Sequence, residues 1–185
     1  SGPTVHGDTL FQGFSDGSLA ALMVDSGKLR WLKSLKTRTR FYDVDTTPAV
    51  DTVGVVAATY DGKLYGLDKD SGVIQWTFPA GAYGAPLIES NRLYVSGLDG
   101  NLYALDRETS AVVWKTPFGK GVALSPARSG EYLVVTTSGD PVVVVDPKTG
   151  AIVAKTNLGN GTLAAATGSP DGWFYTASNY SNLIS

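Results

Sequence analysis

The sequence contains no cysteine among its 185 residues, which excludes disulfides, thiolate metal sites and cysteine nucleophiles. Charged residues are also scarce: they make up 17% of the chain, against roughly 25% in typical soluble domains. The net charge is -2 and no basic stripe is visible, which argues against nucleic-acid binding. What the chain does contain is 22 glycines and 43% hydrophobic residues, a balance typical of an all-β protein with many turns.

Long apolar runs and helical periodicity are missing too. No apolar run approaches the roughly 20 residues that a helix needs to span a bilayer. No stretch repeats apolar residues at helical spacing between capping residues, so we expect essentially no helix. No signal peptide or lipid-attachment cysteine is seen, so we expect any targeting segment or lipid anchor to lie upstream of this sequence.

One pattern recurs along the chain and is its strongest signal. Each copy has a first turn rich in Asp and Gly, an apolar run, a second turn of the Asp-x-x-Ser/Thr-Gly type and then a large aromatic residue. The first turns lie at Asp16, Asp61, Asp99, Gly139 and Tyr180, which are 38 to 45 residues apart. This spacing matches the roughly 40–45 residues of a four-stranded propeller blade. Thirteen residues before each of the first four turns stands a proline: Pro3, Pro48, Pro86 and Pro126.

The chemistry of each position fits four short strands per copy. Asp-Gly between apolar runs predicts a hairpin, with a type I′ turn because that turn needs positive φ. Proline at a strand start costs little, since its missing N–H is not needed there. We predict an all-β fold: a β-propeller of four-stranded antiparallel blades, with four complete blades and a partial fifth. The expected blades span approximately 2–35, 47–80, 85–118, 122–158 and 163–185.

Trp31, Trp76 and Trp114 occupy the same place in the first three copies. A large aromatic residue at one position of successive blades is typical of packing between neighbours, so we interpret the three as structural inter-blade residues rather than ligand-stacking ones. Ala154 stands where the fourth copy should have its tryptophan. We therefore expect the contact of that blade with its neighbour to be thinner, or filled by other side chains.

The repeat unit resembles the pyrroloquinoline-quinone propeller repeat, which occurs in quinoprotein dehydrogenases and in many propellers that are not enzymes. That resemblance identifies the fold and leaves the function open. A narrower resemblance is carried by the run 43–50, Asp-Val-Asp-Thr-Thr-Pro-Ala-Val, together with 1–8, 17–23 and 26–31 in the same order. These segments and the ending 181–185 are similar to the BamB family of outer-membrane-protein assembly lipoproteins.

The BamB resemblance implies an eight-bladed propeller on the periplasmic face of the outer membrane of a Gram-negative bacterium, of which this chain would be the C-terminal part. It implies a non-catalytic scaffold without a cofactor. Such a scaffold binds the periplasmic domains of BamA, the barrel subunit of the assembly machinery, and aids insertion of outer-membrane proteins. The partner surface of the family includes the two aspartates that match Asp43 and Asp45, and a loop that lies upstream of this sequence.

The connection between the first tryptophan and the second proline is the longest in the chain. Long loops with arginine and aromatic residues are plausible docking surfaces, because these residues are favoured at binding hot spots. The alternative is that the aspartates cap a turn or pair with the arginines on a solvated loop. The candidate partner-binding residues of this connection are Arg38, Arg40, Phe41, Tyr42, Asp43 and Asp45.

Catalysis and metal binding find little support in the sequence. Two acids at i and i+2 share one face of a strand, but no histidine or third carboxylate accompanies Asp43 and Asp45 at usable spacing. His6 is the only histidine and stands beside an expected turn, where a surface residue is the simpler interpretation. We expect no catalytic residue, no metal and no cofactor.

Two other functions stay open at this point. A fragment of a quinone-dependent dehydrogenase would need quinone-stacking residues and Ca²⁺ carboxylates at the ring centre, and none is visible in the sequence. The second open function is that of an interaction or sensor domain, in which the propeller binds another partner. Four blades and a part of a fifth expose two sheet edges, so we expect a piece of a longer chain that self-associates when alone.

Overall fold

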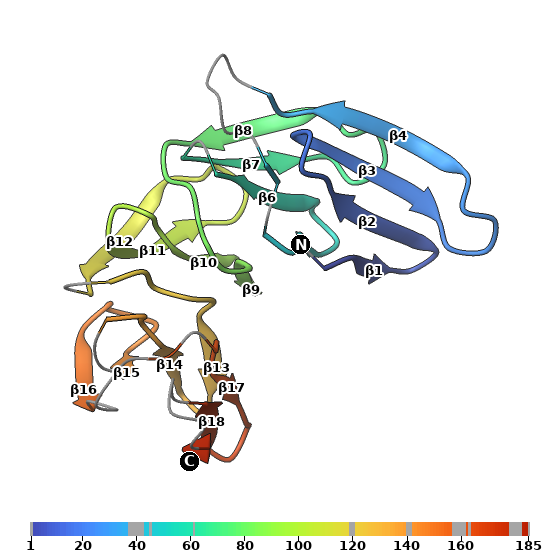
Figure 1. Cartoon of the computed structure of the whole chain (residues 1–185). Helices are drawn as coiled ribbons and strands as arrows, with labels where there is room; N and C mark the ends of the chain where they lie inside the picture. Colours follow the sequence, from blue (N-terminus) through green and yellow to red (C-terminus); the bar gives the residue numbers. More distant parts are fainter. Residues whose placement is uncertain are drawn as a thin grey trace.

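The computed structural model of the chain describes residues 2–36, 43–44, 46–60, 62–118, 121–139, 142–156, 162, 164–177 and 183–184. Within these ranges every regular element is a β-strand, and no helix that could cross a membrane is found there. The strands form five antiparallel sheets, four of four strands and one of three. Figure 1 shows the sheets following one another along an open arc from the N-terminus to the C-terminus.

The sheets are numbered blade 1 to blade 5 in chain order, and within each blade the strands neighbour one another in that same order. Blade 1 consists of β1 (Thr4–His6), β2 (Thr9–Gly13), β3 (Ser18–Met23) and β4 (Leu29–Ser34). Blade 2 consists of β5 (Ala49–Val50), β6 (Val55–Thr59), β7 (Lys63–Leu67) and β8 (Ile74–Phe78). Blade 3 consists of β9 (Leu87–Glu89), β10 (Arg92–Ser96), β11 (Asn101–Asp106) and β12 (Val112–Pro117). Blade 4 consists of β13 (Ala127–Ser129), β14 (Tyr132–Val135), β15 (Val142–Val145) and β16 (Ile152–Thr156). Blade 5 consists of β17 (Thr167–Gly168), β18 (Phe174–Ala177) and β19 (Leu183–Ile184).

The apolar core is divided among the spaces between neighbouring blades. All five residues of β6 are buried, because both of its faces are covered. Val55 and Ala57 pack in a cluster with residues of blade 1, whereas Val56 and Ala58 pack in a cluster with residues of blade 3. Successive side chains of a strand point to opposite faces, so a strand covered on both sides needs a continuous apolar run rather than an alternating one.

The hairpin turns between the second and third strands differ in type from the prediction. A type I′ turn requires positive φ at both central residues. In the described turns only glycine takes positive φ, at 80° for Gly17 and 82° for Gly100. The amide of Gly100 donates to the carbonyl of Gly97, 3.1 Å away, and the amide of Gly97 donates to the carbonyl of Asn101, 2.8 Å away. This is a three-residue loop closed by a left-handed glycine, and it keeps the predicted pairing of the strands.

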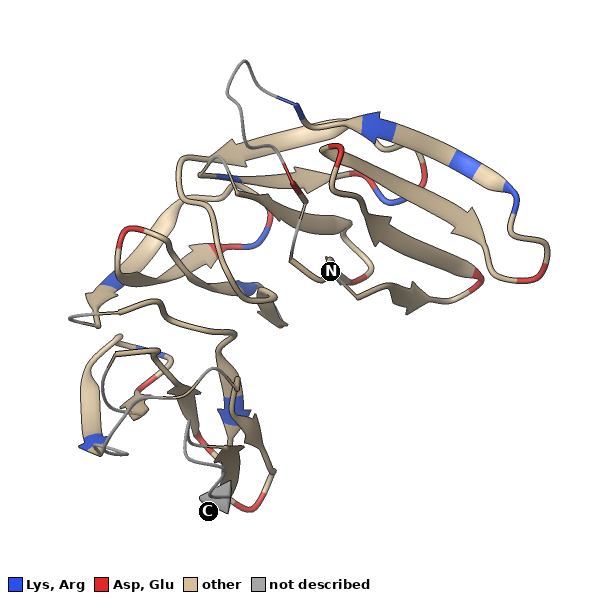
Figure 2. Cartoon of the chain, viewed as in Figure 1, with Lys and Arg blue, Asp and Glu red and all other residues tan. Residues whose placement is uncertain are grey.

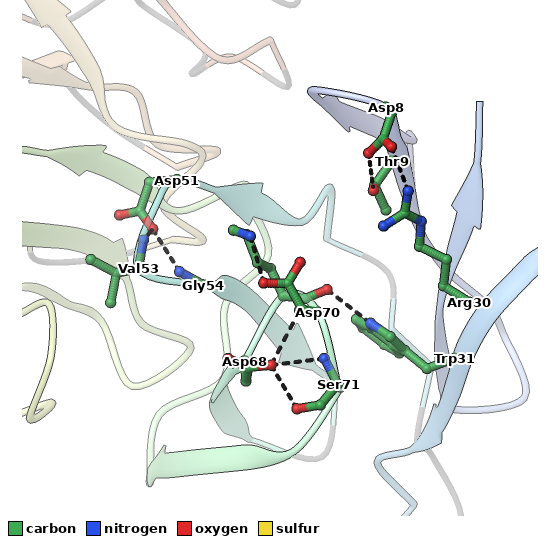
Figure 3. A network of polar contacts seen from close by, with 11 residues as sticks. Asp8, Thr9, Arg30, Trp31, Asp51, Val53, Gly54, Asp68, Asp70 and Ser71 are labelled. Carbon is green, nitrogen blue, oxygen red and sulfur yellow. Dashed lines mark hydrogen bonds and ion pairs between the residues drawn. The ribbon is translucent and has the colours of Figure 1, made fainter. Parts of the chain in front are cut away.

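Acidic residues lie mainly in the turns (Figure 2). Several of their carboxylates accept backbone hydrogen bonds. In the turn from β7 to β8, the Asp68 carboxylate accepts the backbone amide of Ser71 at 2.7 Å and its hydroxyl at 2.6 Å (Figure 3). Asp106 repeats the arrangement with Thr109 in the turn from β11 to β12, at 2.9 and 2.8 Å. The Ser71 hydroxyl is the main cause that lowers the pKa of Asp68. The repeated Asp and Ser/Thr of the sequence therefore fix the shape of this turn.

Candidate partner-binding site

The candidate site lies on the connection from β4 to β5. The structure describes Asp43 in it, half-buried, while Arg38, Arg40, Phe41, Tyr42 and Asp45 lie outside the described residues. No ion pair joins the Asp43 side chain to another residue of the described ranges. What the structure does show is how the residues around Asp43 are held.

Val44 anchors the run to blade 1. Its side chain is buried, and its amide donates a hydrogen bond to the carbonyl of Phe14, 3.2 Å away, beside the turn from β2 to β3. Gly13 makes room for it, because a Cβ at that position would lie 2.5 Å from Cγ1 of Val44. The valine between the two aspartates is therefore a core residue that fixes the chain on which they stand.

Thr46 anchors the same run to blade 2. Its buried hydroxyl oxygen accepts the amide of Ala58 at 3.1 Å and donates to the carbonyl of Ala58 at 3.3 Å. The next residue, Thr47, accepts the amide of Gly2 at 3.2 Å through its hydroxyl. A buried hydroxyl that satisfies both backbone groups of one residue replaces a strand partner. The run 43–48 is thus fastened to two blades at once.

The backbone of Asp43 completes the anchoring. Its carbonyl accepts the amide of Tyr60, 3.0 Å away, at the tip of the turn from β6 to β7. Val44 and Thr46 are both buried, so their side chains hold the backbone of this run against the core. The run therefore places the half-buried Asp43 on a fixed backbone, and little backbone entropy is left to lose when a partner binds.

Sequence reasoning singled out the aspartates of this run and missed Val44 and Thr46. The available signal was the alternation of acidic residues with a small apolar and a hydroxyl residue. That alternation indicates that one set of side chains is buried and the other is not. It does not reveal that the Thr46 hydroxyl bonds to the backbone of Ala58, twelve residues further along the chain.

Trp31 lies between blades 1 and 2. Its indole nitrogen donates to the carbonyl of Lys69, 2.8 Å away, in the turn from β7 to β8 (Figure 3). Its ring lies against Gly72, where a Cβ would come within 2.7 Å of Cδ2. Trp114 has the same relation to blade 4: its nitrogen donates to the carbonyl of Pro147 at 3.0 Å, and its ring lies against Gly150.

Trp76 is placed differently. Its ring lies over Gly66, its partner on the neighbouring strand β7 of the same blade. Its side chain packs in a cluster that contains residues of blades 2 and 3, such as Leu93. The buried indole nitrogen has no hydrogen-bond partner within the part of the chain that the structure describes. Ala154 is exposed on β16, where the fourth copy lacks the tryptophan.

Two observations concern acidic and histidine side chains in the described residues. No group of three or more His, Cys, Asp or Glu side chains that could hold a metal ion occurs among the described residues. His6 ends β1, half-buried, next to the turn at Gly7. The described part of the site offers the half-buried Asp43 on a backbone that is tied to blades 1 and 2.

Comparison with known proteins supplies the family. A family profile described as outer membrane protein assembly factor BamB matches residues 1–116. BamB of Legionella pneumophila is 34% identical over 100 residues, covering 51% of this chain and 26% of that protein. BamB of Alteromonas naphthalenivorans is 34% identical over 166 residues, covering 86% of this chain and 40% of that protein. The chain thus matches less than half of the length of these relatives.

Solved structures show the same fold. BamB from Moraxella catarrhalis matches with a TM-score of 0.82 at 22% identity, covering 96% of this chain and 57% of that chain. The quinohemoprotein alcohol dehydrogenase from Comamonas testosteroni matches with a TM-score of 0.71 at 16% identity, covering 95% of this chain and 36% of that chain. At these identities the likeness concerns the fold alone, which is a β-propeller of the pyrroloquinoline-quinone repeat type.

Proposed function

The chain belongs to the BamB family, and from this membership we propose that it is a non-catalytic scaffold of the outer-membrane β-barrel assembly machinery. In this role it binds the periplasmic domains of the BamA subunit, at the periplasmic face of the outer membrane. The observation that carries the proposal is the family match over residues 1–116, which contains the anchored run 43–48.

The geometry of the run supports a binding role for Asp43. Its own carbonyl accepts the amide of Tyr60, and the backbone that follows it is tied to blades 1 and 2 through Val44 and Thr46. A carboxylate held in this way recognises a positively charged group with a small entropic cost. Asp45 and the arginines and aromatics of 38–42 belong to the proposal by their place on the same connection.

The ring is the second part of the proposal. We propose that the four complete blades and the three-stranded blade 5 form part of an eight-bladed propeller. The support is that the chain covers 57% of the BamB chain from Moraxella catarrhalis with a TM-score of 0.82.

The proposal is tested by titrating the purified chain into the periplasmic domains of BamA by calorimetry. The double variant Asp43→Ala/Asp45→Ala should bind at least about tenfold more weakly, because removing both carboxylates takes away the charge that a basic partner group would meet. Asp25→Ala is the matched control, since Asp25 is exposed in the turn from β3 to β4 at the other end of blade 1. Undiminished binding by the double variant would remove the aspartates from the site, and no binding by wild type would refute the function.

The dehydrogenase alternative is separated by a second titration. The match to the quinohemoprotein alcohol dehydrogenase has 16% identity, so it supports a shared fold and no shared chemistry. Pyrroloquinoline quinone with Ca²⁺ should leave the tryptophan fluorescence of the chain unchanged. Saturable quenching at micromolar quinone would favour the dehydrogenase reading over the scaffold.

A further inference from the structure

Two exposed tyrosines from neighbouring loops stand together beside Asp43. The rings of Tyr60 and Tyr83 have centroids 5.9 Å apart and meet edge to face, at 78°. Their exposed fractions are 45% and 47%, although each ring is already partly covered by the other. Tyr60 lies at the tip of the turn from β6 to β7, and Tyr83 lies in the loop from β8 to β9.

Both tyrosines stand on backbone that is held in place. The amide of Tyr60 donates to the carbonyl of Asp43, as described above. The residue before Tyr83, Ala82, forms an antiparallel bridge with Gly97. One residue further back, the carbonyl of Gly81 accepts the amide of Leu98 at 2.9 Å. The loop from β8 to β9 is therefore paired with the turn from β10 to β11.

These contacts bring together the connections that carry five residues, which form one surface. We call it the tyrosine patch, and it consists of Asp43, Tyr60, Tyr83, Leu98 and Asp99. Leu98 is 39% exposed and Asp99 is exposed beside it. All five residues belong to turns or loops at the same end of the blades, because antiparallel strands bring these connections to one end. The patch thus combines apolar and aromatic side chains with two aspartates, of which Asp99 already accepts hydrogen bonds from Tyr103 and Asn101.

The composition of the patch indicates what it recognises. Tyrosine offers a large contact area and has only two side-chain torsions to restrict, which is why it is enriched at binding hot spots. Exposed aromatic residues that cluster in contact are typical of interaction sites rather than of ordinary surface. The flanking aspartates favour positive charge on the partner.

We infer that the tyrosine patch extends the partner surface from Asp43 across blades 2 and 3, and that it receives an apolar side chain flanked by Lys or Arg on the periplasmic domains of BamA. The inference rests on the proposed function and adds residues to it. The patch is continuous with Asp43, because a single backbone hydrogen bond links Asp43 to Tyr60 and the ring contact links Tyr60 to Tyr83.

The test compares the double variant Tyr60→Ala/Tyr83→Ala with Tyr132→Ala in calorimetric titrations against the BamA periplasmic domains. Tyr132 is the matched control because it is 44% exposed and begins β14 at the opposite end of blade 4. We expect about tenfold or weaker binding for the double variant and wild-type affinity for the control. Wild-type affinity in the double variant, with Asp43→Ala/Asp45→Ala still impaired, would overturn the patch and leave the proposed function standing.

A second measurement does not depend on the stability of an alanine variant. A photo-crosslinking phenylalanine analogue is placed at position 83 or at position 132 of the chain and irradiated with the BamA domains. Cross-links from position 83 and none from position 132 support the patch. Equal yields, or cross-links from position 132 alone, contradict it, and failure of the wild-type chain to bind in calorimetry removes the proposed function together with the patch.

Discussion

Trp31 and Trp76 occupy the same position in successive blades, yet their indole rings lie in different surroundings. Trp31 reaches into the next blade, lies against Gly72 and donates to the carbonyl of Lys69. Trp76 lies back over Gly66 of its own blade, and its indole nitrogen has no partner among the described residues. Trp114 repeats the first arrangement, so the second is the exception.

Two residues account for the exception. The turn that faces Trp76 carries Ser110 where the turns facing the other two tryptophans carry glycine, and Ser110 keeps the same left-handed backbone with φ of 59°. A Cβ at Gly72 would lie 2.7 Å from the ring of Trp31, so a serine in this position excludes that placement of the ring. On the strand beside each tryptophan, Gly66 replaces the alanine that stands at positions 21 and 104. The missing methyl group opens the space that the ring of Trp76 takes.

The interface between blades 2 and 3 has another means of attachment. The guanidinium of Arg107 is 1% exposed and donates from Nε and Nη2 to the two carboxylate oxygens of Asp51, at 2.9 and 2.8 Å. The residue at the matching place in the previous turn, Lys69, pairs instead with its exposed neighbour Asp70. One interface is therefore joined by an indole hydrogen bond and the next by a buried ion pair.

The largest effect is expected when Trp31 is truncated, and Trp76 provides the comparison. Trp31→Ala removes a buried ring and its hydrogen bond and should lower the free energy of unfolding by about 4 kcal/mol. Trp76→Ala should cost about 2 kcal/mol less, because it also removes a buried donor that has no partner. Urea denaturation followed by circular dichroism measures both values. Trp173→Ala, at a site that is 57% exposed, is the control and should stay within about 0.5 kcal/mol of wild type.

The next largest effect is expected from the ion pair. Asp51→Asn leaves the buried guanidinium of Arg107 without its counter-charge and should cost about 3 kcal/mol. Asp70→Asn is the matched change in the previous turn, where the side chain is 70% exposed, and should cost no more than about 0.5 kcal/mol. Equal costs for the two substitutions in urea denaturation would show that the interface of blades 2 and 3 does not depend on the pair.

The fold could be predicted from the sequence because the same turn and strand pattern repeats along the chain. The 38 to 45 residue spacing of the turns and the recurring proline, glycine and tryptophan predicted four-stranded antiparallel blades, and the structure contains them. The type of the turn between the second and third strands could not be predicted. Asp-Gly suits both a two-residue and a three-residue loop, and the choice between them depends on strand register. Ser110 and Gly66 differ visibly from the residues at the same positions of the other repeats. Their effect on Trp76 depends on where its indole ring lies, which the sequence does not determine.

The candidate site likewise contains residues that could be predicted from the sequence and residues that could not. Asp43 and Asp45 stood out because they match the two aspartates of the BamB partner surface and lie on the longest connection of the chain. Tyr60 and Tyr83 gave no comparable signal: they are 23 residues apart, in different loops, and belong to no motif of the repeat. Their contact depends on long-range pairing: Tyr60 bonds to the connection at Asp43, and the loop of Tyr83 pairs with the turn from β10 to β11. This pairing is a property of the stacking and not of local sequence.

A paired substitution tests the explanation for the two ring placements. Gly66→Ala alone should cost about 2 kcal/mol, since the new methyl group meets the ring of Trp76 while Ser110 closes the other placement. Ser110→Gly alone should stabilise by about 1 kcal/mol, because glycine adopts positive φ without strain. In the double variant the ring can move to the placement seen for Trp31, so the costs should be non-additive by at least about 1 kcal/mol. Additive values in urea denaturation would contradict the explanation.

The smallest effect is expected from acid. Hydrogen bonds from Ser71 lower the pKa of Asp68 below its ordinary value of 3.8, so Asp68 stabilises the fold above that pH and loses its contribution as the pH falls through the lower folded value. Asp68 shapes the turn whose Lys69 carbonyl accepts the indole of Trp31, whereas no described turn accepts the indole of Trp76. In a nitrogen-15 NMR titration from pH 5 to pH 2, the indole resonance of Trp31 should therefore shift with Asp68 and that of Trp76 should not. Asp68→Asn should abolish the shift, and an equal response of both indoles would mean that the two interfaces are coupled rather than independent.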